Sequence, residues 1–180
     1  MVDKKTGAPQ DEKQAAQPTI QVVAQYVKDF SFENPNSPES LLAGLGAPET
    51  SVQINLKHHQ LREGAYEAVL NFKIEAKFKE KAKVAFIIEL AYAATVAISG
   101  FPKEQHQPIL MVEIPKLLFP FAREIIAKAT MQGGYPPLYL QPVNFDAIYV
   151  QETQRAQAAA AAEEGHPAKA AGGKGGKKAN

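Results

Sequence analysis

Two neighbouring segments of this chain alternate between apolar and polar side chains over lengths that suit a β-sheet. In residues 66–78 the even-numbered positions are all apolar and the odd-numbered positions are mostly charged or polar. In residues 84–98 the even positions are again apolar, while the odd positions are mixed and include Glu89. Successive side chains of a strand point to opposite faces of its sheet. The pattern therefore predicts two long strands, each with one buried face.

Two further strands are predicted upstream. Residues 19–33 alternate as well, and Asn34–Pro38 end this segment with residues typical of turns. The even positions carry Ile20, Val22, Ala24, Tyr26, Phe30 and Phe32, with Val23 and Val27 as exceptions. A shorter strand is marked by Val52, Ile54 and Leu56. Short turns near residues 62–64 and 80–82 separate the last three strands, which favours an antiparallel meander.

Helical spacing replaces the alternation after Gly100. An apolar stripe in residues 117–131 contains Leu118, Phe121, Ala122, Ile125, Ile126 and Ala129. Gly133 and Gly134 supply a helix stop, and Asn144 is suited to cap a last helix that reaches about residue 162. Strands followed by helices predict an α+β fold, with a four-stranded antiparallel sheet and long helices on one face.

The organisation expected is one domain between two tails. Residues 1–18 are polar and are expected to be disordered, residues 19–162 form the domain, and residues 163–180 are a flexible tail rich in Lys, Gly and Ala. With 20 Lys and Arg against 19 Asp and Glu, the chain lacks the basic excess that nucleic-acid binding rewards. There is no apolar segment typical of a signal peptide near Met1, and the longest apolar run is too short to span a bilayer. We therefore expect a soluble cytoplasmic protein.

Residues that could carry chemistry are scarce. The chain has no cysteine, and the pair His58–His59 would point to opposite faces of a strand, so the two could not chelate one metal ion. The glycine- and lysine-rich tail lacks the spacing of a phosphate-binding loop. We expect no catalytic residue, no metal and no cofactor.

The segment from Tyr135 to Val143 is a loop made largely of apolar residues, although loops normally run over the surface in polar residues. It must either pack as core or offer an apolar surface to a partner. The mixed odd face of residues 84–98 also suggests self-association. If Asp29 and Glu33 lie near Glu89, the sheet carries acids around an apolar spot; the simpler alternative is an ordinary solvated face.

Four runs of this sequence resemble the SecB protein-export chaperone family. They are YVKDFSFENPN at residues 26–36, YEAVL at 66–70, LFPFARE at 118–124 and PVNFDA at 142–147. They occur in the family's order and cover roughly residues 20–151. The near-neutral charge and the Lys-rich tail depart from the acidic character of many members.

The resemblance implies a homotetramer, built as a dimer of dimers, that binds unfolded precursor proteins and delivers them to the SecA motor without using a nucleotide. It also implies roles for individual residues. SecA would contact Asp29, Glu33, Ile87 and Glu89. The positions that influence tetramer assembly are Ile88, Leu90 and Tyr92. A client groove beside the loop would involve Ile54, Leu56, Tyr135, Leu138, Leu140 and Phe145.

Two alternatives remain at this stage. The chain could be a SecB-like chaperone that guards another client, such as an antitoxin. It could also be an enzyme or binding protein for an apolar ligand, with His58 or His59 as a base.

Overall fold

The computed structural model describes residues 17–42, 46–79 and 83–164. The chain divides after Val143 into two compact units, each described here by itself. The predictions for the N-terminal tail, the tail after residue 164 and the turn at residues 80–82 fall almost entirely outside the described residues.

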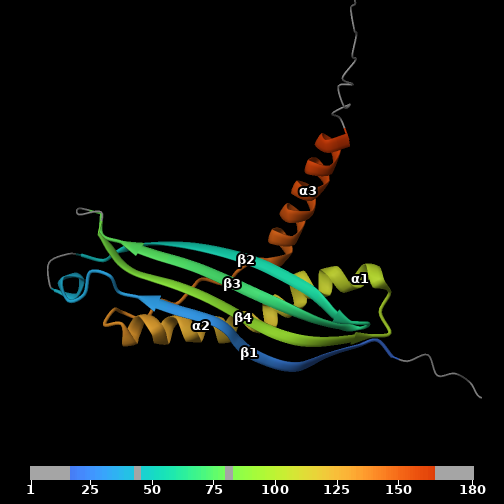
Figure 1. Cartoon of the computed structure of the whole chain (residues 1–180), viewed down its shortest axis with the longest axis horizontal. Coiled ribbons are helices and arrows are strands. Elements are labelled where there is room, and N and C mark those ends of the chain that lie inside the picture. Colours follow the sequence, from blue (N-terminus) through green and yellow to red (C-terminus); the bar gives the residue numbers. More distant parts are fainter. Residues whose placement is uncertain (1–16, 43–45, 80–82, 165–180) are drawn as a thin grey trace, which may run out of the picture. The chain divides into compact units, whose positions relative to one another are not determined.

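The first unit contains one four-stranded antiparallel sheet (Figure 1). Its strands are β1 (Thr19–Glu33), β2 (Glu49–Arg62), β3 (Ala65–Lys77) and β4 (Val84–Ser99), in the order β1-β4-β3-β2. The predicted meander of β2, β3 and β4 is confirmed. The connection after β1, which includes the short 3-10 helix η1 (Glu39–Leu41), crosses to the opposite edge, so β1 pairs with β4.

One face of the sheet is buried by helix α2 (Ile114–Gln132). The even-numbered side chains of β3 and β4 lie on this helix face, and Leu70, Ile74 and Ile88 are fully buried there. The other face, which we call the open face, carries the odd-numbered side chains of these strands. The alternation in the sequence therefore predicted correctly which side chains of β3 and β4 face α2.

The regular alternation expected for β1 is wrong, because the strand contains two bulges. Its register against β4 shifts between Val22 and Ala24 and again between Val27 and Asp29. Each bulge inserts one residue and exchanges the faces of those that follow. Tyr26 consequently lies on the open face opposite Ala93, whereas Val27 lies on the helix face opposite Tyr92.

The helical segment after the sheet runs without a break from Lys103 to Gln132. It comprises α1 (Lys103–Pro108), the π-helical segment η2 (Ile109–Glu113) and α2. Pro108 ends α1, but Pro120 lies inside α2 without ending it. Of the predicted stripe, Leu118, Ala122, Ile126 and Ala129 are buried, while Phe121 is 46% exposed at its margin. Gly133 ends the helix as expected.

The second unit begins with helix α3 (Phe145–Glu164). Its predicted cap is confirmed, because the Ala147 amide donates to Asn144 Oδ1 over 3.0 Å. The helix extends two residues beyond the predicted end.

Candidate interaction surfaces

An acidic patch forms on the open face where β1 and β4 run side by side. The register places Asp29 beside Ala91, Ser31 beside Glu89 and Glu33 beside Ile87. Residues opposite each other in an antiparallel pair point to the same face. The structure therefore brings together Asp29, Glu33, Ile87 and Glu89, which the sequence linked only on the condition that the two strands were neighbours.

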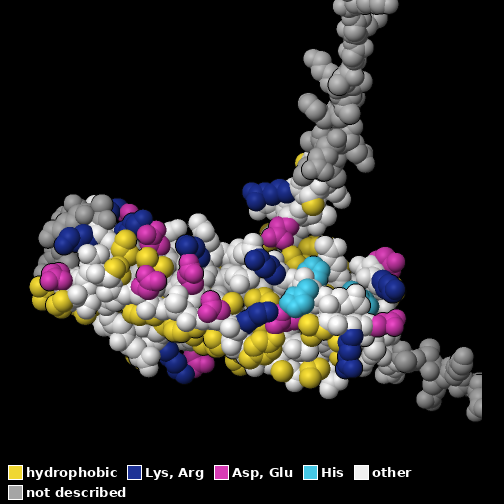
Figure 2. Space-filling view, in the orientation of Figure 1, with side chains coloured by type: hydrophobic (Ala, Val, Ile, Leu, Met, Phe, Trp, Pro, Cys, Tyr) yellow, Lys and Arg dark blue, Asp and Glu magenta, His cyan; other side chains and the backbone are white. Residues whose placement is uncertain are grey.

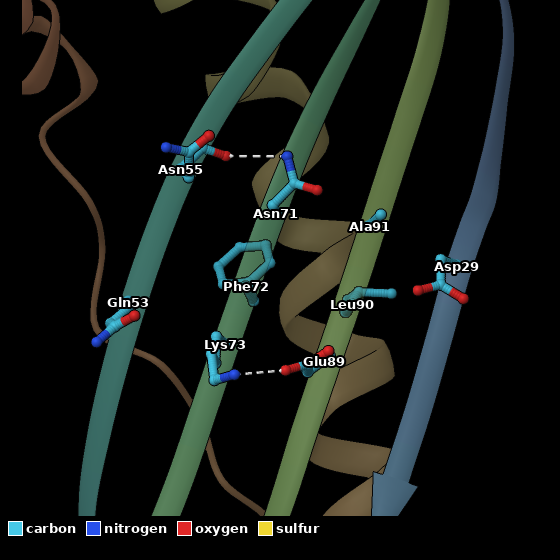
Figure 3. A pocket seen from close by; sticks show the side chains of 9 residues that line it. All are labelled: Asp29, Gln53, Asn55, Asn71, Phe72, Lys73, Glu89, Leu90 and Ala91. Atoms are coloured by element: carbon cyan, nitrogen blue, oxygen red, sulfur yellow. Dashed lines mark hydrogen bonds and ion pairs between the residues drawn. The ribbon is translucent and has the colours of Figure 1, made fainter.

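A shallow depression of about 250 Å³ lies in this patch, shown in Figure 3. The residues that line it include Asp29 from β1, Glu89 and Ala91 from β4 and Lys73 from β3. Lys73 Nζ lies 2.7 Å from Glu89 Oε1. Figure 2 shows acidic and basic side chains interspersed over the molecule in the same orientation as Figure 1. The open face is thus polar and charged around a small apolar centre.

Further along the open face, Glu67 of β3 is only 5% exposed and is held by three neighbours. Tyr26 OH donates a hydrogen bond to Glu67 Oε1. Lys28 Nζ lies 2.5 Å from Glu67 Oε2, and His59 Nε2 of β2 lies 3.0 Å from the same oxygen. We call these four residues the Glu67 cluster. Together they connect β1, β3 and β2 across the sheet.

The cluster favours an ionised carboxylate. Burial acts to raise the pKa of Glu67, but the hydrogen bonds from Lys28 and Tyr26 outweigh it, so the pKa is lowered. The same bonds raise the pKa of the Tyr26 hydroxyl and of the Lys28 ammonium group. This cluster was not predicted, because Glu67 occupies a polar position of an alternating strand.

The apolar loop that follows α2 begins with an anchored residue. Tyr135 is 8% exposed, and its hydroxyl lies 2.9 Å from the Ala85 carbonyl oxygen and 2.8 Å from Ser40 Oγ. The same hydroxyl lies 3.0 Å from Asn34 Oδ1. This end of the loop is fixed to β4 and to the connection after β1.

Two more contacts hold the loop against α2. The Leu138 amide donates to Thr130 Oγ1 over 2.9 Å. The Arg123 guanidinium lies 5.4 Å from the centre of the Tyr139 ring. Along the loop, Leu140 is buried, Leu138 is half-buried and Tyr139 is 61% exposed. Part of the loop is therefore core, and part of it is apolar surface.

The remaining residues predicted for a client groove lie on two different elements. Ile54 and Leu56 pair with Phe72 and Leu70, so they lie on the helix face of the edge strand β2. Ile54 is half-buried and Leu56 is buried. Figures 1 and 3 show the loop running behind the sheet towards the β2 side. Phe145 is the first residue of α3, in the second unit.

Comparison with known proteins decides the family. Residues 13–156 match the family model described as preprotein translocase subunit SecB. The chain belongs to the SecB family.

Relatives with the same family name are close in length and sequence. A protein-export protein SecB of Nitrobacter winogradskyi is 48% identical over 145 residues, which cover 81% of this chain and 90% of the relative. A protein-export protein SecB of Rhodopseudomonas palustris strain BisB18 is 46% identical over 162 residues, which cover 89% of this chain and 96% of the relative. The fold also resembles a SecB-like chaperone of Mycobacterium tuberculosis, solved in complex with an antitoxin peptide. That likeness has a TM-score of 0.57 at 12% identity and covers 69% of this chain and 91% of that chain.

The three positions expected to influence SecB assembly lie under α2 of the same chain. Ile88, Leu90 and Tyr92 are at most 8% exposed, and the Tyr92 ring stacks on Phe121 of α2 with 6.3 Å between ring centres. These three side chains are therefore covered within their own chain, while Phe30 and Val27 of β1, opposite Leu90 and Tyr92, stay exposed. Phe121, by contrast, presents part of its ring to solvent.

Two histidines of this SecB-family chain, His59 and His106, have structural partners in the part that the structure describes. His59 belongs to the Glu67 cluster, and His58 points to the opposite face. His106 Nδ1 lies 2.8 Å from Tyr66 OH, and its Nε2 lies 3.2 Å from the Phe101 carbonyl oxygen. Within the described ranges, no three His, Asp or Glu side chains gather as metal ligands would. Among the helices described, none has the length and apolar character needed to cross a membrane.

Proposed function

We propose that this chain is an ATP-independent molecular chaperone of protein export. It binds unfolded secretory precursor proteins in the cytoplasm, keeps them competent for translocation and delivers them to SecA, without catalysis, metal or cofactor. The observation that carries the proposal is the chemical difference between the two sides of one sheet. The open face is charged, whereas the helix side ends in an anchored apolar loop. Holding a client and docking on a motor can then use separate surfaces.

The client surface is assigned to the loop and to the nearby face of β2. Its residues in the first unit are Ile54, Leu56, Tyr135, Leu138 and Leu140, and Phe145, in the second unit, is proposed separately as a client contact. The anchors at Tyr135 and Leu138 support this assignment, because a surface fixed in advance loses little conformational freedom when it binds.

The strength of holding follows from many weak contacts. Burying one large apolar side chain stabilises a complex by about 1.5–3 kcal/mol, and association removes about 4–15 kcal/mol. A short segment that seats four or five side chains therefore binds weakly or moderately. A long unfolded chain that engages several copies of the surface gains an avidity of about 10²–10⁴. Folded proteins bury such segments and are not bound.

The client assignment is tested by Leu138→Asp, measured as the affinity for a urea-unfolded secretory precursor in the absence of ATP. Leu138 is half-buried, so the substitution perturbs the fold less than one at the buried Leu140. We expect affinity to fall about 10–100-fold, from the loss of one buried apolar side chain. The control is Leu61→Asp, at a 53% exposed position near the end of β2. Equal affinities for the two variants would remove the loop from the client surface.

The SecA contact is assigned to Asp29, Glu33, Ile87 and Glu89. We expect Glu89→Lys to weaken SecA binding and to leave precursor binding unchanged, since the two surfaces lie on opposite sides of the sheet. Added salt should weaken the SecA contact more than client holding, because exposed charges are screened. Unchanged SecA affinity in Glu89→Lys would exclude Glu89 from the contact.

A homotetramer, arranged as a dimer of dimers, is the proposed assembly. It is supported by apolar side chains left exposed on β1 and α2. These are Val23, Val27, Phe30, Leu117 and Phe121, each at least 41% exposed. Light scattering should give the mass of four chains, and Phe121→Asp should reduce that mass. The control Lys128→Asp changes an exposed, charged position of the same helix.

A second client class is favoured by one comparison. The M. tuberculosis SecB-like chaperone was solved with an antitoxin peptide, but its 12% identity supports the fold alone. The relatives at 46–48% identity are named for protein export, and we give export precedence. A chain that binds an antitoxin and ignores an unfolded precursor would reverse this order.

A further inference from the structure

Lys73 lies within the acidic patch and forms an ion pair with one of its carboxylates, that of Glu89. In the sheet register it stands directly opposite Glu89, on the open face. Its Nζ atom is 2.7 Å from Glu89 Oε1, and Figure 3 shows it reaching Glu89 from the side away from β1. Asp29 lines the other side of the same depression.

The patch holds Lys73 in its charged form. The hydrogen bond to Glu89 raises the pKa of the Lys73 ammonium group, and the charge of Glu89 raises it further. The charges of Glu75 and Glu33 add smaller contributions in the same direction. Lys73 therefore offsets part of the negative potential that would attract a basic partner.

The neighbouring carboxylates are engaged to different degrees. Glu75 Oε2 pairs with Lys77 Nζ at 2.8 Å, further along the same strand. In the described part of the chain, Asp29 and Glu33 form no ion pair. A cation that entered the depression from solvent could contact Asp29 at once, but it would have to displace Lys73 to reach Glu89 fully.

We propose that Lys73 is an internal counter-ion, which masks Glu89 in the free chaperone and is displaced by a Lys or Arg side chain of the docking partner. This inference rests on the proposed SecA contact and deepens it. The Lys73 and Glu89 side chains are 62% and 48% exposed, so the pair opens into water without uncovering a buried charge. Lys73 then sets the affinity of the patch, and its removal strengthens docking.

The experiment measures SecA affinity of the full chain by calorimetry at low and high salt. Exposed ion pairs of this kind correspond to about 1.4–5-fold in an equilibrium constant, so Lys73→Gln should bind SecA about 2–5-fold more tightly at low salt. The gain should shrink at high salt, where exposed charges are screened. The matched control is Lys77→Gln, which removes the same charge from the same face of β3 but releases Glu75 instead of Glu89. Its affinity should stay close to that of the unmodified chain.

A second pair of variants separates this inference from the SecA assignment. In a Glu89→Gln background, Lys73→Gln should increase the affinity for SecA no more than Lys77→Gln does. In the chain that keeps Glu89, equal gains in SecA affinity from Lys73→Gln and Lys77→Gln would indicate a net-charge effect and overturn the inference. Weaker binding by Lys73→Gln would mean that Lys73 itself contacts the partner, which overturns it as well. If Glu89→Gln alone leaves SecA affinity unchanged, the SecA assignment itself fails.

Discussion

Lys28 of β1 and Glu67 of β3 are joined across the intervening strand β4, with 2.5 Å between Lys28 Nζ and Glu67 Oε2. Strands two places apart in a sheet are separated by about 10 Å, so the side chains themselves must cover the gap. Tyr26 makes the same crossing from β1 to the other oxygen of Glu67. The edge strand is thereby fixed between its two bulges, immediately before the acids at Asp29 and Glu33.

Glu67→Gln should destabilise the chain in a pH-dependent manner. Because the pKa of Glu67 is lower in the folded chain than its ordinary value of 4.5, the unfolded chain takes up the proton first as the pH falls. The stabilisation from Glu67 is present in full above that value and is lost as the pH falls through the folded pKa. Near pH 7 we expect Glu67→Gln to lower the free energy of unfolding by about 1.5–3 kcal/mol, as for hydrogen bonds to charged groups.

Denaturant unfolding between pH 7 and pH 3 measures this effect. The difference in the free energy of unfolding between Glu67→Gln and the unmodified chain should become smaller as the solution becomes acidic. The control is Glu75→Gln, on the same face of β3, whose carboxylate forms a more exposed pair with Lys77. If this difference in the free energy of unfolding stays the same down to pH 3, the assignment of an ionised Glu67 is contradicted.

Ala93 provides the space that lets Tyr26 cross β4. It is fully buried on the open face, directly between Tyr26 and Val69 in the register. We expect Ala93→Leu to lower the free energy of unfolding by about 1–3 kcal/mol, the usual cost of overpacking. It should also remove most of the acid-dependent stability, because Tyr26 and Lys28 would lose their contact with Glu67.

The energetic coupling between Ala93 and Glu67 is the decisive measurement for the role of Ala93. If both substitutions disrupt one cluster, the double variant Ala93→Leu with Glu67→Gln should be less destabilised than the sum of the single variants. Ala97→Leu, at a half-buried position of the same face of β4, serves as control and should add independently to Glu67→Gln. Strict additivity for Ala93→Leu would show that its cost arises elsewhere.

The sheet could be predicted from the sequence because its signal is local. In β3 and β4 the polarity of a residue indicates which face of the sheet its side chain lies on. The core at Leu70, Ile74 and Ile88 follows from this two-residue period. The bulges of β1 were not predicted, although Val23 and Val27 stood out as apolar exceptions to the alternation. The register explains both, because Val23 lies in the first bulge and Val27 follows it on the helix face.

The Glu67 cluster could not be predicted for a different reason. Alternation places Glu67 on the polar face, where solvation is the default expectation. Its burial depends on side chains from β1 and β2 that converge only through the strand order. The acidic patch was predictable in part, because the alternation placed Asp29, Glu33 and Glu89 at odd positions of their strands, but their proximity required β1 to pair with β4.

Tyr135→Phe should separate the structural role of Tyr135 from its proposed role in client binding. The substitution removes the hydroxyl that contacts Ala85, Ser40 and Asn34 and keeps the ring. Leaving buried polar partners unsatisfied costs about 1–3 kcal/mol, which thermal or denaturant unfolding would detect. Precursor affinity under conditions where the variant is folded should be unchanged. Tyr139→Phe, on a 61% exposed ring, should change stability by less than about 0.5 kcal/mol; equal losses for the two variants would contradict the anchoring role.

Gly133→Ala should destabilise the end of α2 through one steric contact. A Cβ atom at this position would lie 2.2 Å from Cζ of Phe32, whose ring packs against Phe86 with 6.0 Å between ring centres. The φ angle of Gly133 is −75°, which alanine adopts without strain, so the cost arises from the ring alone. We expect a loss of about 1–3 kcal/mol in the free energy of unfolding.

The second substitution Phe32→Leu tests this explanation, because a smaller side chain leaves room for the added methyl group. In the Phe32→Leu background, Gly133→Ala should therefore cost less than it does in the unmodified chain. Gly134→Ala is the contrasting case, since Gly134 has a φ of +88° and faces Leu41 rather than Phe32. Its cost comes mainly from the backbone, so Phe32→Leu should not relieve it. Relief of both glycine variants by Phe32→Leu would mean that the turn as a whole relaxes and that no single contact limits position 133.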